Sequence, residues 1–405
     1  MSMRAHICRM MVLIASILSL CSFTIQDERN GTIITVSETG QAALAQPKIM
    51  FELRDAKTGA PLRKSQDDLT ELLGEPQPLA FLDTGASSFI ISKTTAERFG
   101  LRTDDAGRFV ETGMSGDHAM EVSIPYTLAL THHPLAMTDD PGRDPRNPGR
   151  SDVLEFKAQR LLINRNVDEL TQLLGVLGGA IDVVGMPAIS EMMFEIQPQR
   201  ADESSVPVRI LTPRARLRAG VWIPLEMMEF SRRKHPDNRD PLPALARNPV
   251  IPRVKAAAGA MEADGDWLLD TGSAFTIISV KTAQAIGLFD AEGRPVRPAD
   301  FQLPAGGISG QVHQLPGFQI DRVEFRGEGG TKVVFERPFV VVHDVSTTLD
   351  DGSIITLDGI LGMNLLLNSG SEFKGTGFAE KHESVFESVI FDGPRARFGL
   401  ARIKN

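Results

Sequence analysis

Cysteine is almost absent from this chain, and aromatic residues are scarce. The two cysteines, Cys8 and Cys21, both lie near the N-terminus, and aromatic residues make up only 6% of the sequence. Once a leader is removed, no thiol is expected to remain, which excludes disulfide bonds and thiol chemistry in the mature chain. We therefore expect the stability of the mature protein to come from the packing of its cores.

Basic residues are outnumbered by acidic ones, with 43 lysines and arginines against 52 aspartates and glutamates. The formal net charge is -9 and the pI is near 5.5, whereas nucleic-acid-binding domains usually carry a basic surface. We therefore expect no nucleic-acid partner. No motif indicates a metal or a cofactor: His132 and His133 have no partner at ligand spacing, and Gly259–Gly265 lacks the helix of a phosphate-binding loop. No convincing Ser-His-Asp arrangement can be assembled either.

Long apolar runs are missing as well. The run over residues 10–23 follows two arginines and is too short to span a bilayer comfortably, which is typical of an export signal. We expect residues 1–45 to form a leader of an exported protein, periplasmic or secreted, with no membrane span in the mature chain. An uncleaved membrane anchor or a lipid anchor at Cys21 is the alternative. The cleavage site stays open, with Ala43-Leu44-Ala45 as one candidate.

Short strand-like segments with turn residues between them dominate the rest of the chain. Examples are Ile49–Leu53, Val122–Leu130 and Phe339–Val342. This pattern predicts a mainly β fold, and 405 residues suggest two or three domains. A polar, proline-rich insertion at His132–Ser151 is predicted to be a surface loop.

Few helices are expected, and all of them are short. Ser92 and Ser279 follow apolar strands and are placed as N-caps for helices of about two turns. Gly100 and Gly287 lie where a residue in the left-handed conformation would end each helix. Two further helices are predicted at Asp67–Leu73 and Asp168–Leu174.

The tripeptide Asp-Thr-Gly occurs twice, and each copy lies in a longer repeated segment. Residues 81–101 (FLDTGASSFIISKTTAERFGL) and 268–288 (LLDTGSAFTIISVKTAQAIGL) share 11 of 21 positions without a gap. A single Asp-Thr-Gly arises readily by chance and usually marks a turn, whereas two copies in matching segments indicate a duplication. The duplication supplies two equivalent aspartates, Asp83 and Asp270.

Two further elements recur in the same order in each half. A Gly-x-Ser-Gly segment follows each Asp-Thr-Gly, at Gly113–Gly116 and at Gly307–Gly310. Further on, two branched apolar residues precede Gly-Met, at Val183–Met186 and at Ile360–Met363. Either element alone would be interpreted as a turn or a core strand, but the ordered repetition argues against chance. We divide the chain into a leader, an N-terminal lobe (46–205), an inter-lobe linker with opening strands (206–250) and a C-terminal lobe (251–405).

The chemistry available to the two aspartates follows from their surroundings. Each follows a pair of apolar residues and is expected at the end of a buried strand, and the glycine two residues later permits close backbone approach. If Asp83 and Asp270 meet across a pseudo-twofold axis, they cannot both ionise at low cost and share a proton. One is then a base and the other an acid, as activation of water against an amide carbonyl requires. The alternative is a pair of turn or helix-capping aspartates in a duplicated β protein.

These motifs resemble those of aspartic proteases, the pepsin and retropepsin superfamily. The resemblance covers residues 46–405 in outline and is specific around the three repeated elements. It implies a bilobal, double-psi β-barrel-like fold with pseudo-twofold symmetry, with Asp83 and Asp270 as the catalytic pair and no metal or cofactor. Two halves in one chain, with Asp-Thr-Gly-Ala and Gly-x-Ser-Gly segments, imply a single-chain, retropepsin-like protease of the bacterial type.

The resemblance also implies roles for residues around the pair. Thr84 and Thr271 would form hydrogen bonds across the two halves beneath the carboxyl groups. Support of the active-site loops is implied for Gly85, Gly272, Ser273, Gly185 and Gly362. Closure over an extended peptide, as the tips of flaps, is implied for Gly113, Met114, Ser115, Gly116, Gly307, Ile308, Ser309 and Gly310.

One position of the repeated segments sets the halves apart. Ala86 in the first segment corresponds to Ser273 in the second, and a hydrogen bond from the Ser273 hydroxyl would stabilise a charged Asp270. This predicts Asp270 as the ionised member of the pair.

The single tyrosine, Tyr126, lies in the run Val122–Leu130 and is predicted to occupy a strand position rather than the tip of a pepsin-type flap.

The leading prediction is an exported aspartic endopeptidase that acts as a monomer on peptide or protein substrates. Water held between the two aspartates would attack the scissile carbonyl, without a metal or a covalent intermediate. The rival is a non-catalytic peptide-binding or structural protein on the same scaffold. Retention of a carboxylate in both halves favours the enzyme, because a binding module has no evident need for the pair.

Overall fold

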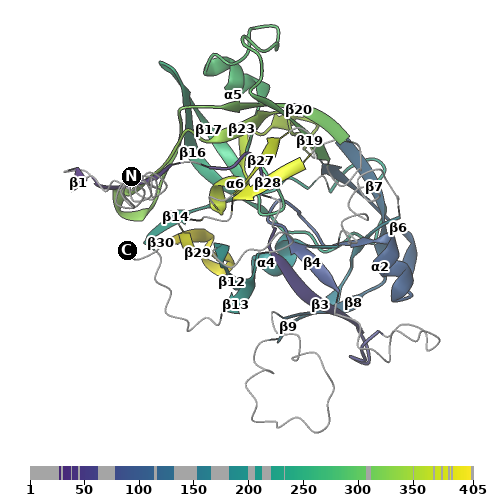
Figure 1. Ribbon diagram of the computed structural model, residues 1–405. Coiled ribbons are helices and arrows are strands. Elements are labelled where there is room, and N and C mark those ends of the chain that lie inside the picture. The colour runs from purple at the N-terminus through teal and green to yellow at the C-terminus, as the bar shows by residue number, and fades with distance from the viewer. Residues whose placement is uncertain are drawn as a thin grey trace, which may run out of the picture.

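Strands dominate the computed structural model, and its helices are short (Figure 1). The predicted mainly β class is therefore confirmed. The apolar run at 10–23, the helices predicted at 67–73 and 168–174, and the loop predicted at 132–151 lie outside the described residues. The structure describes residues 27–28, 31–37, 39–43, 46–62, 78–113, 116–131, 153–165, 182–198, 206–211, 220–231, 233–306, 312–349, 351–367, 370–374, 377–381, 384 and 386–402.

The first half of the chain forms a nine-stranded sheet. Alternating apolar residues give its strands a buried face: in β3, Ile49, Phe51 and Leu53 are each at most 1% exposed. The spatial order of the strands is β6 (Thr103–Gly113), β7 (Gly116–Ser123), β10 (Leu162–Asn164), β5 (Ile90–Ser92), β11 (Val183–Val184), β4 (Leu79–Leu82), β3 (Lys48–Asp55), β8 (Tyr126–Thr131) and β9 (Val153–Gln159).

Nine strands of the second half repeat this order strand for strand. In each half the strand that leads into Asp-Thr-Gly pairs in parallel with the strand before Gly-Met, β4 with β11 and β17 with β26. The duplication seen in short sequence segments therefore extends to the topology of a whole sheet. The spatial order is β19 (Phe301–Gly306), β20 (Val312–Gln319), β23 (Phe339–Val342), β18 (Ile277–Ile278), β26 (Gly359–Leu361), β17 (Met261–Leu269), β16 (Asn248–Ala258), β21 (Arg322–Arg326) and β22 (Lys332–Glu336).

The two predicted helices of the repeated segments are confirmed with their caps. Ser92 accepts a hydrogen bond from the amide of Thr95 at the start of α2 (Lys93–Arg98). Ser279 accepts one from the amide of Thr282 at the start of α5 (Val280–Ala285). Gly100 and Gly287 follow with φ of 60° and 75°, the left-handed conformation that glycine adopts readily. A second matched pair, α4 (Met186–Ile189) and α6 (Met363–Leu366), begins after Gly185 and Gly362. None of the helices in the described part of the chain is long and apolar enough to cross a membrane.

The predicted strand position of Tyr126 is also confirmed. The residue begins β8 and is 4% exposed. Its hydroxyl accepts a hydrogen bond from the backbone amide of Arg102 at 2.8 Å. This tyrosine therefore belongs to the core of the first half.

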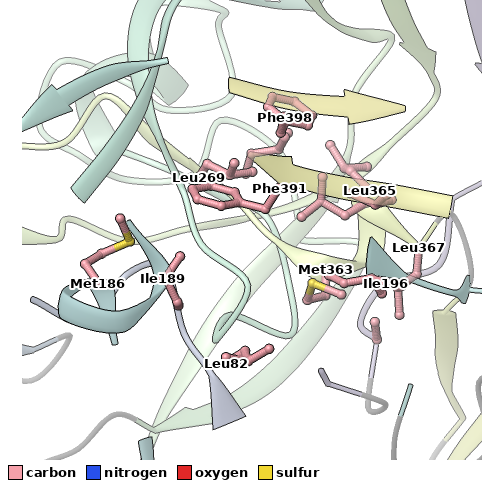
Figure 2. Packing of buried hydrophobic residues seen from close by; sticks show 14 of the residues in the cluster. Leu82, Met186, Ile189, Ile196, Leu269, Met363, Leu365, Leu367, Phe391 and Phe398 are labelled. Carbon is pink, nitrogen blue, oxygen red and sulfur yellow. The ribbon is translucent and has the colours of Figure 1, made fainter. Parts of the chain in front are cut away.

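A third sheet draws on both halves, and its core lies against the two Asp-Thr-Gly strands. Leu82 and Leu269, which end β4 and β17, share one hydrophobic cluster with residues of α4, α6 and the third sheet (Figure 2). Both leucines are at most 1% exposed, and full burial of one such side chain contributes about 1.5–3 kcal/mol. The five strands of this sheet are β13 (Val208–Leu211), β12 (Met193–Ile196), β29 (Phe386–Asp392), β30 (Arg397–Arg402) and β14 (Val221–Pro224).

The remaining elements are small. The strand β15 (Glu226–Met228) pairs with β16, and two hairpins are formed by β24–β25 (Ser346–Thr348, Ile354–Thr356) and β27–β28 (Gly370–Lys374, Gly377–Lys381). Two 3₁₀ turns are η5 (Glu328–Gly330) and η6 (Gly393–Arg395).

Residues before position 46 extend the second sheet. The strand β2 (Gly31–Ser37) pairs in parallel with β22, and β1 (Asp27–Glu28) pairs with β2. Val36 is fully buried, and the carbonyl of Gly40 accepts a hydrogen bond from the Asn364 side chain at 3.2 Å. The position at which a leader ends stays a prediction. Residues 31–37 and 39–43 nevertheless pack as a structural part of the second half.

A chain that begins at residue 46 is therefore expected to be less stable than one that begins at residue 27. The truncation removes β2 and the buried side chains of Val36, Ala42 and Ala43. Burial of valine alone contributes about 1.5–3 kcal/mol, so we expect the free energy of unfolding in urea to fall by at least about 2 kcal/mol. A chain that begins at residue 31 is the control, because it lacks only β1. Equal unfolding midpoints for all three chains would contradict the prediction.

Candidate active site

Reciprocal hydrogen bonds join the two Asp-Thr-Gly loops. The amide of Thr84 donates to the hydroxyl of Thr271 at 3.1 Å, and the amide of Thr271 donates to the hydroxyl of Thr84 at 3.0 Å. Each hydroxyl in turn donates to the carbonyl before the opposite aspartate, Thr84 to Leu269 at 2.5 Å and Thr271 to Leu82 at 2.6 Å. Both threonines are at least 97% buried. These four bonds fix the two loops relative to each other.

The glycines of the motif allow each carboxyl group to lie against the opposite loop. A Cβ atom on Gly85 would stand 2.7 Å from the carboxyl carbon of Asp270, and one on Gly272 would stand closer still to Asp83. Real side-chain atoms do not approach so closely, so a larger residue would displace the carboxyl group. Each glycine is thus required by the contact between its own loop and the aspartate of the opposite loop.

Gly185 and Gly362 lie directly behind the loops. A Cβ atom on either glycine would overlap backbone carbonyl atoms of its loop. The amide of Met186 donates to the carbonyl of Ala86 at 2.9 Å, and the equivalent bond from Met363 in the second half is 2.8 Å long. These positions therefore contact the loops in the way that the motif resemblance implies.

The carboxyl groups of Asp83 and Asp270 are hydrogen-bonded to each other. Asp83 Oδ1 also accepts the amides of Gly85 at 2.7 Å and Ala86 at 3.1 Å. Asp270 Oδ1 accepts the two equivalent amides at 2.8 and 3.1 Å. Both aspartates are half-buried, so the pair is held by the protein and still open to small molecules.

Burial raises the pKa of both carboxyl groups, but to different degrees. For Asp83 the hydrogen bond from Asp270 and the loop amides oppose the rise in pKa. For Asp270 the negative charge of Asp83 adds to the effect of burial and raises the pKa well above its ordinary value. Because the pKa of Asp270 is raised further than that of Asp83, we assign the proton of the pair to Asp270.

This distribution of charge corrects the prediction made for Ser273. The hydroxyl of Ser273 donates to the carbonyl of Phe275 at 2.7 Å, and only the backbone amide of Ser273 reaches Asp270. The expected hydrogen bond from the Ser273 hydroxyl to Asp270 is therefore not formed, and the prediction of an ionised Asp270 loses its basis. A local backbone carbonyl competes for the serine hydroxyl, as is common for serine in turns.

Two amide side chains outside the repeated segments support the loops from the opposite half. Asn248, fully buried at the start of β16, donates to the carbonyls of Thr84 at 3.1 Å and Gly85 at 3.0 Å. Gln46, which precedes β3, donates to the carbonyl of Gly272. Each side chain thus belongs to the segment that enters one half and contacts the loop of the other. The sequence reasoning missed both residues, because neither lies in a repeated motif.

The strands on either side of the two Gly-x-Ser-Gly segments, β6 with β7 and β19 with β20, pair at equivalent edges of the two large sheets. Gly113 and Gly116 face each other across the end of hairpin β6–β7. Met114, Ser115 and Gly307–Gly310 lie outside the described residues, although β19 and β20 lead to the second segment. The flap role of these positions stays a prediction.

Within the described ranges, no three histidine, cysteine, aspartate or glutamate side chains converge as metal ligands would. Fold and site together define a mainly β protein with a duplicated sheet topology and a paired-carboxyl centre between the two repeats.

Comparison with known proteins adds little to this picture. No protein-family model matches the chain, and no curated protein matches it. Among solved structures, basic 7S globulin from soybean is similar, with 11% sequence identity and a TM-score of 0.40 over 88% of this chain and 96% of that one. A likeness of this strength carries no argument, so a proposal of function depends on the residues of the site.

Replacing Asp270 with asparagine is expected to stabilise the protein at neutral pH. A carboxyl whose pKa rises on folding contributes fully below its unfolded pKa of about 4, and this contribution is lost as the pH rises toward the folded pKa. Asparagine keeps an acceptor for the loop amides and a donor for Asp83 but has no proton to lose. We expect the urea midpoint of Asp270→Asn to exceed that of the wild type at pH 7, and the difference to shrink toward pH 3.

The exposed Asp105 offers a matched control, because Asp105→Asn changes the same atoms on the surface of β6. Its effect on the midpoint should be small and similar at both pH values. A loss of stability for Asp270→Asn at pH 7 would contradict the raised pKa.

Proposed function

We propose that this protein is an aspartic endopeptidase in which Asp83 and Asp270 activate water against a peptide bond. One observation carries the proposal: two half-buried aspartates from matching motifs each lie against the loop of the other, and the pKa of both carboxyl groups is raised. A structural aspartate at a turn has no need of a second carboxyl, whose proximity is costly when both ionise. Such a cost is typical of catalytic sites.

The reaction follows from the position of the proton. The ionised Asp83 takes a proton from the attacking water, while the protonated Asp270 donates its own to the carbonyl oxygen of the substrate. The product of this step is a tetrahedral intermediate with two hydroxyl groups. Asp83 then passes its proton to the leaving nitrogen, the carbon–nitrogen bond breaks, and Asp270 recovers its proton from one hydroxyl group.

The frame around the pair supports such a mechanism. The threonine bonds, Asn248 and Gln46 hold both loops, so little rearrangement is needed when substrate binds. Preorganised donors and fixed distances are what lower the barrier of a reaction of this type. A single chain supplies both aspartates, which supports a monomer as the active form.

The substrate class is proposed from the resemblance and the hairpins. The two equivalent strand pairs at the sheet edges, β6 with β7 and β19 with β20, would close over an extended peptide. Export to the periplasm or the medium belongs to the proposal and depends on the leader at residues 1–45.

Replacement of either catalytic aspartate is expected to abolish proteolysis. The test is digestion of an unstructured protein between pH 3 and 7, with and without pepstatin, by the wild type, Asp83→Asn and Asp270→Asn. Loss of one acid–base group costs roughly 10²- to 10⁴-fold in rate, and we expect at least a 10²-fold loss in each variant. Asp105→Asn is the control and should retain the activity of the wild type. Cleavage that survives in Asp83→Asn would refute the mechanism, and binding of peptides without cleavage would favour the non-catalytic rival.

The pH dependence of cleavage is expected to be bell-shaped and insensitive to Ser273. Activity falls as the pH drops through the pKa of Asp83, which must be ionised, and as it rises through that of Asp270, which must be protonated. Because the Ser273 hydroxyl bonds to Phe275, Ser273→Ala should leave both limbs of the profile within about 0.3 pH units. A larger displacement of either limb would show that this hydroxyl acts on the pair.

A further inference from the structure

A third carboxyl group lies beside the catalytic pair, on hairpin β6–β7. Glu111 faces His118 across the hairpin and precedes the closing residue Gly113 by two positions. Only 8% of its surface is exposed. Phe109, two positions earlier on the same face of β6, packs in a cluster with Ala86 of the first active-site loop. The carboxyl group of Glu111 therefore lies on the side of the hairpin that meets this loop.

The carboxyl of Glu111 is only partly satisfied. The backbone amide of Ser87 donates a hydrogen bond to it, while Oε2 is shielded from solvent and has no hydrogen-bond partner. Buried polar atoms are seldom left in this state, because the loss of water is not compensated. A partner from outside the chain would complete the site.

The charges around Glu111 indicate what that partner is. Burial raises the pKa of Glu111 to about 8, and the negative charges of Asp83 and Glu229 add to this effect. Arg233 pairs with Glu229 at 3.7 Å but is itself 45% exposed, and His118 bonds instead to an asparagine of β10. A neutral donor could bond to Oε2 but would leave the surrounding negative charge in place. A cation would bond to Oε2 and would also offset the surrounding negative charge.

We propose that Glu111 forms a subsite for a lysine or arginine side chain of the peptide substrate. The inference rests on the proposed function, because the hairpin packs against the loop that carries Asp83. Lysine and arginine have long apolar stems, so their charged ends can reach a buried carboxylate. Binding of the cation ionises Glu111 and releases its proton to solvent. The subsite would make the enzyme selective for basic residues near the cleaved bond.

The test compares two peptide series that differ at one position, with lysine or arginine in one and glutamine or norleucine in the other. We expect the wild type to cleave the basic series with a kcat/KM at least 10-fold higher. In Glu111→Gln, which keeps an acceptor for the Ser87 amide, the ratio should fall to within 2-fold of unity. The control Glu324→Gln removes an equally buried strand carboxyl from the second half and should leave the ratio unchanged. A wild type without preference, or a preference that persists in Glu111→Gln, would overturn the subsite.

A binding measurement separates failure of the subsite from failure of the proposed function. Fluorescent versions of the same peptides are titrated into Asp270→Asn and into Asp270→Asn with Glu111→Gln. The subsite predicts at least 10-fold tighter binding of the basic series to the first protein and a loss of this difference in the second. If the wild type cleaves no peptide but this difference appears, the endopeptidase proposal fails and the cation subsite holds. If it does not appear, the subsite is refuted whether or not cleavage occurs.

Discussion

Two carboxyl groups in contact repel each other when both are ionised, so their loops must be held in place. In this protein the threonine bonds hold them. Thr84 and Thr271 exchange backbone and side-chain hydrogen bonds with the opposite loop in a buried setting. Because each bond crosses from one repeat to the other, neither loop can move alone. The glycines, the supporting strands β11 and β26, and the shared core around Leu82 and Leu269 all serve this one arrangement.

Much of the site could be predicted from sequence because it is local and repeated. The matching segments predicted both aspartates at strand ends, both helices after Ser92 and Ser279, and the glycines that end those helices. A duplication makes each weak motif a test of its counterpart, so signals that would be dismissed singly become informative. The mainly β class was predicted from short strand-like runs separated by turn residues.

What could not be predicted depends on contacts between residues far apart in the chain. Asn248 and Gln46 have no sequence signature, because their role comes from the path of the chain past the opposite loop. Ser273 was misjudged because a carbonyl two residues away is a nearer acceptor than the carboxylate. No motif of the sequence includes Glu111, and only its burial beside the first active-site loop sets it apart. The addition of β2 to the second sheet is a pairing over almost 300 residues, which local patterns do not record.

The crossed positions of Gln46 and Asn248 bear on how such a molecule can be divided. The segment that enters the first half completes the loop of the second, and the segment that enters the second half completes the loop of the first. The two halves therefore resemble subunits that have exchanged arms within one continuous polypeptide. A fragment carrying either half alone would present an unfinished loop, and only recombination with the other fragment would restore it. The two halves thus depend on each other as the subunits of a dimer do, although one chain carries both.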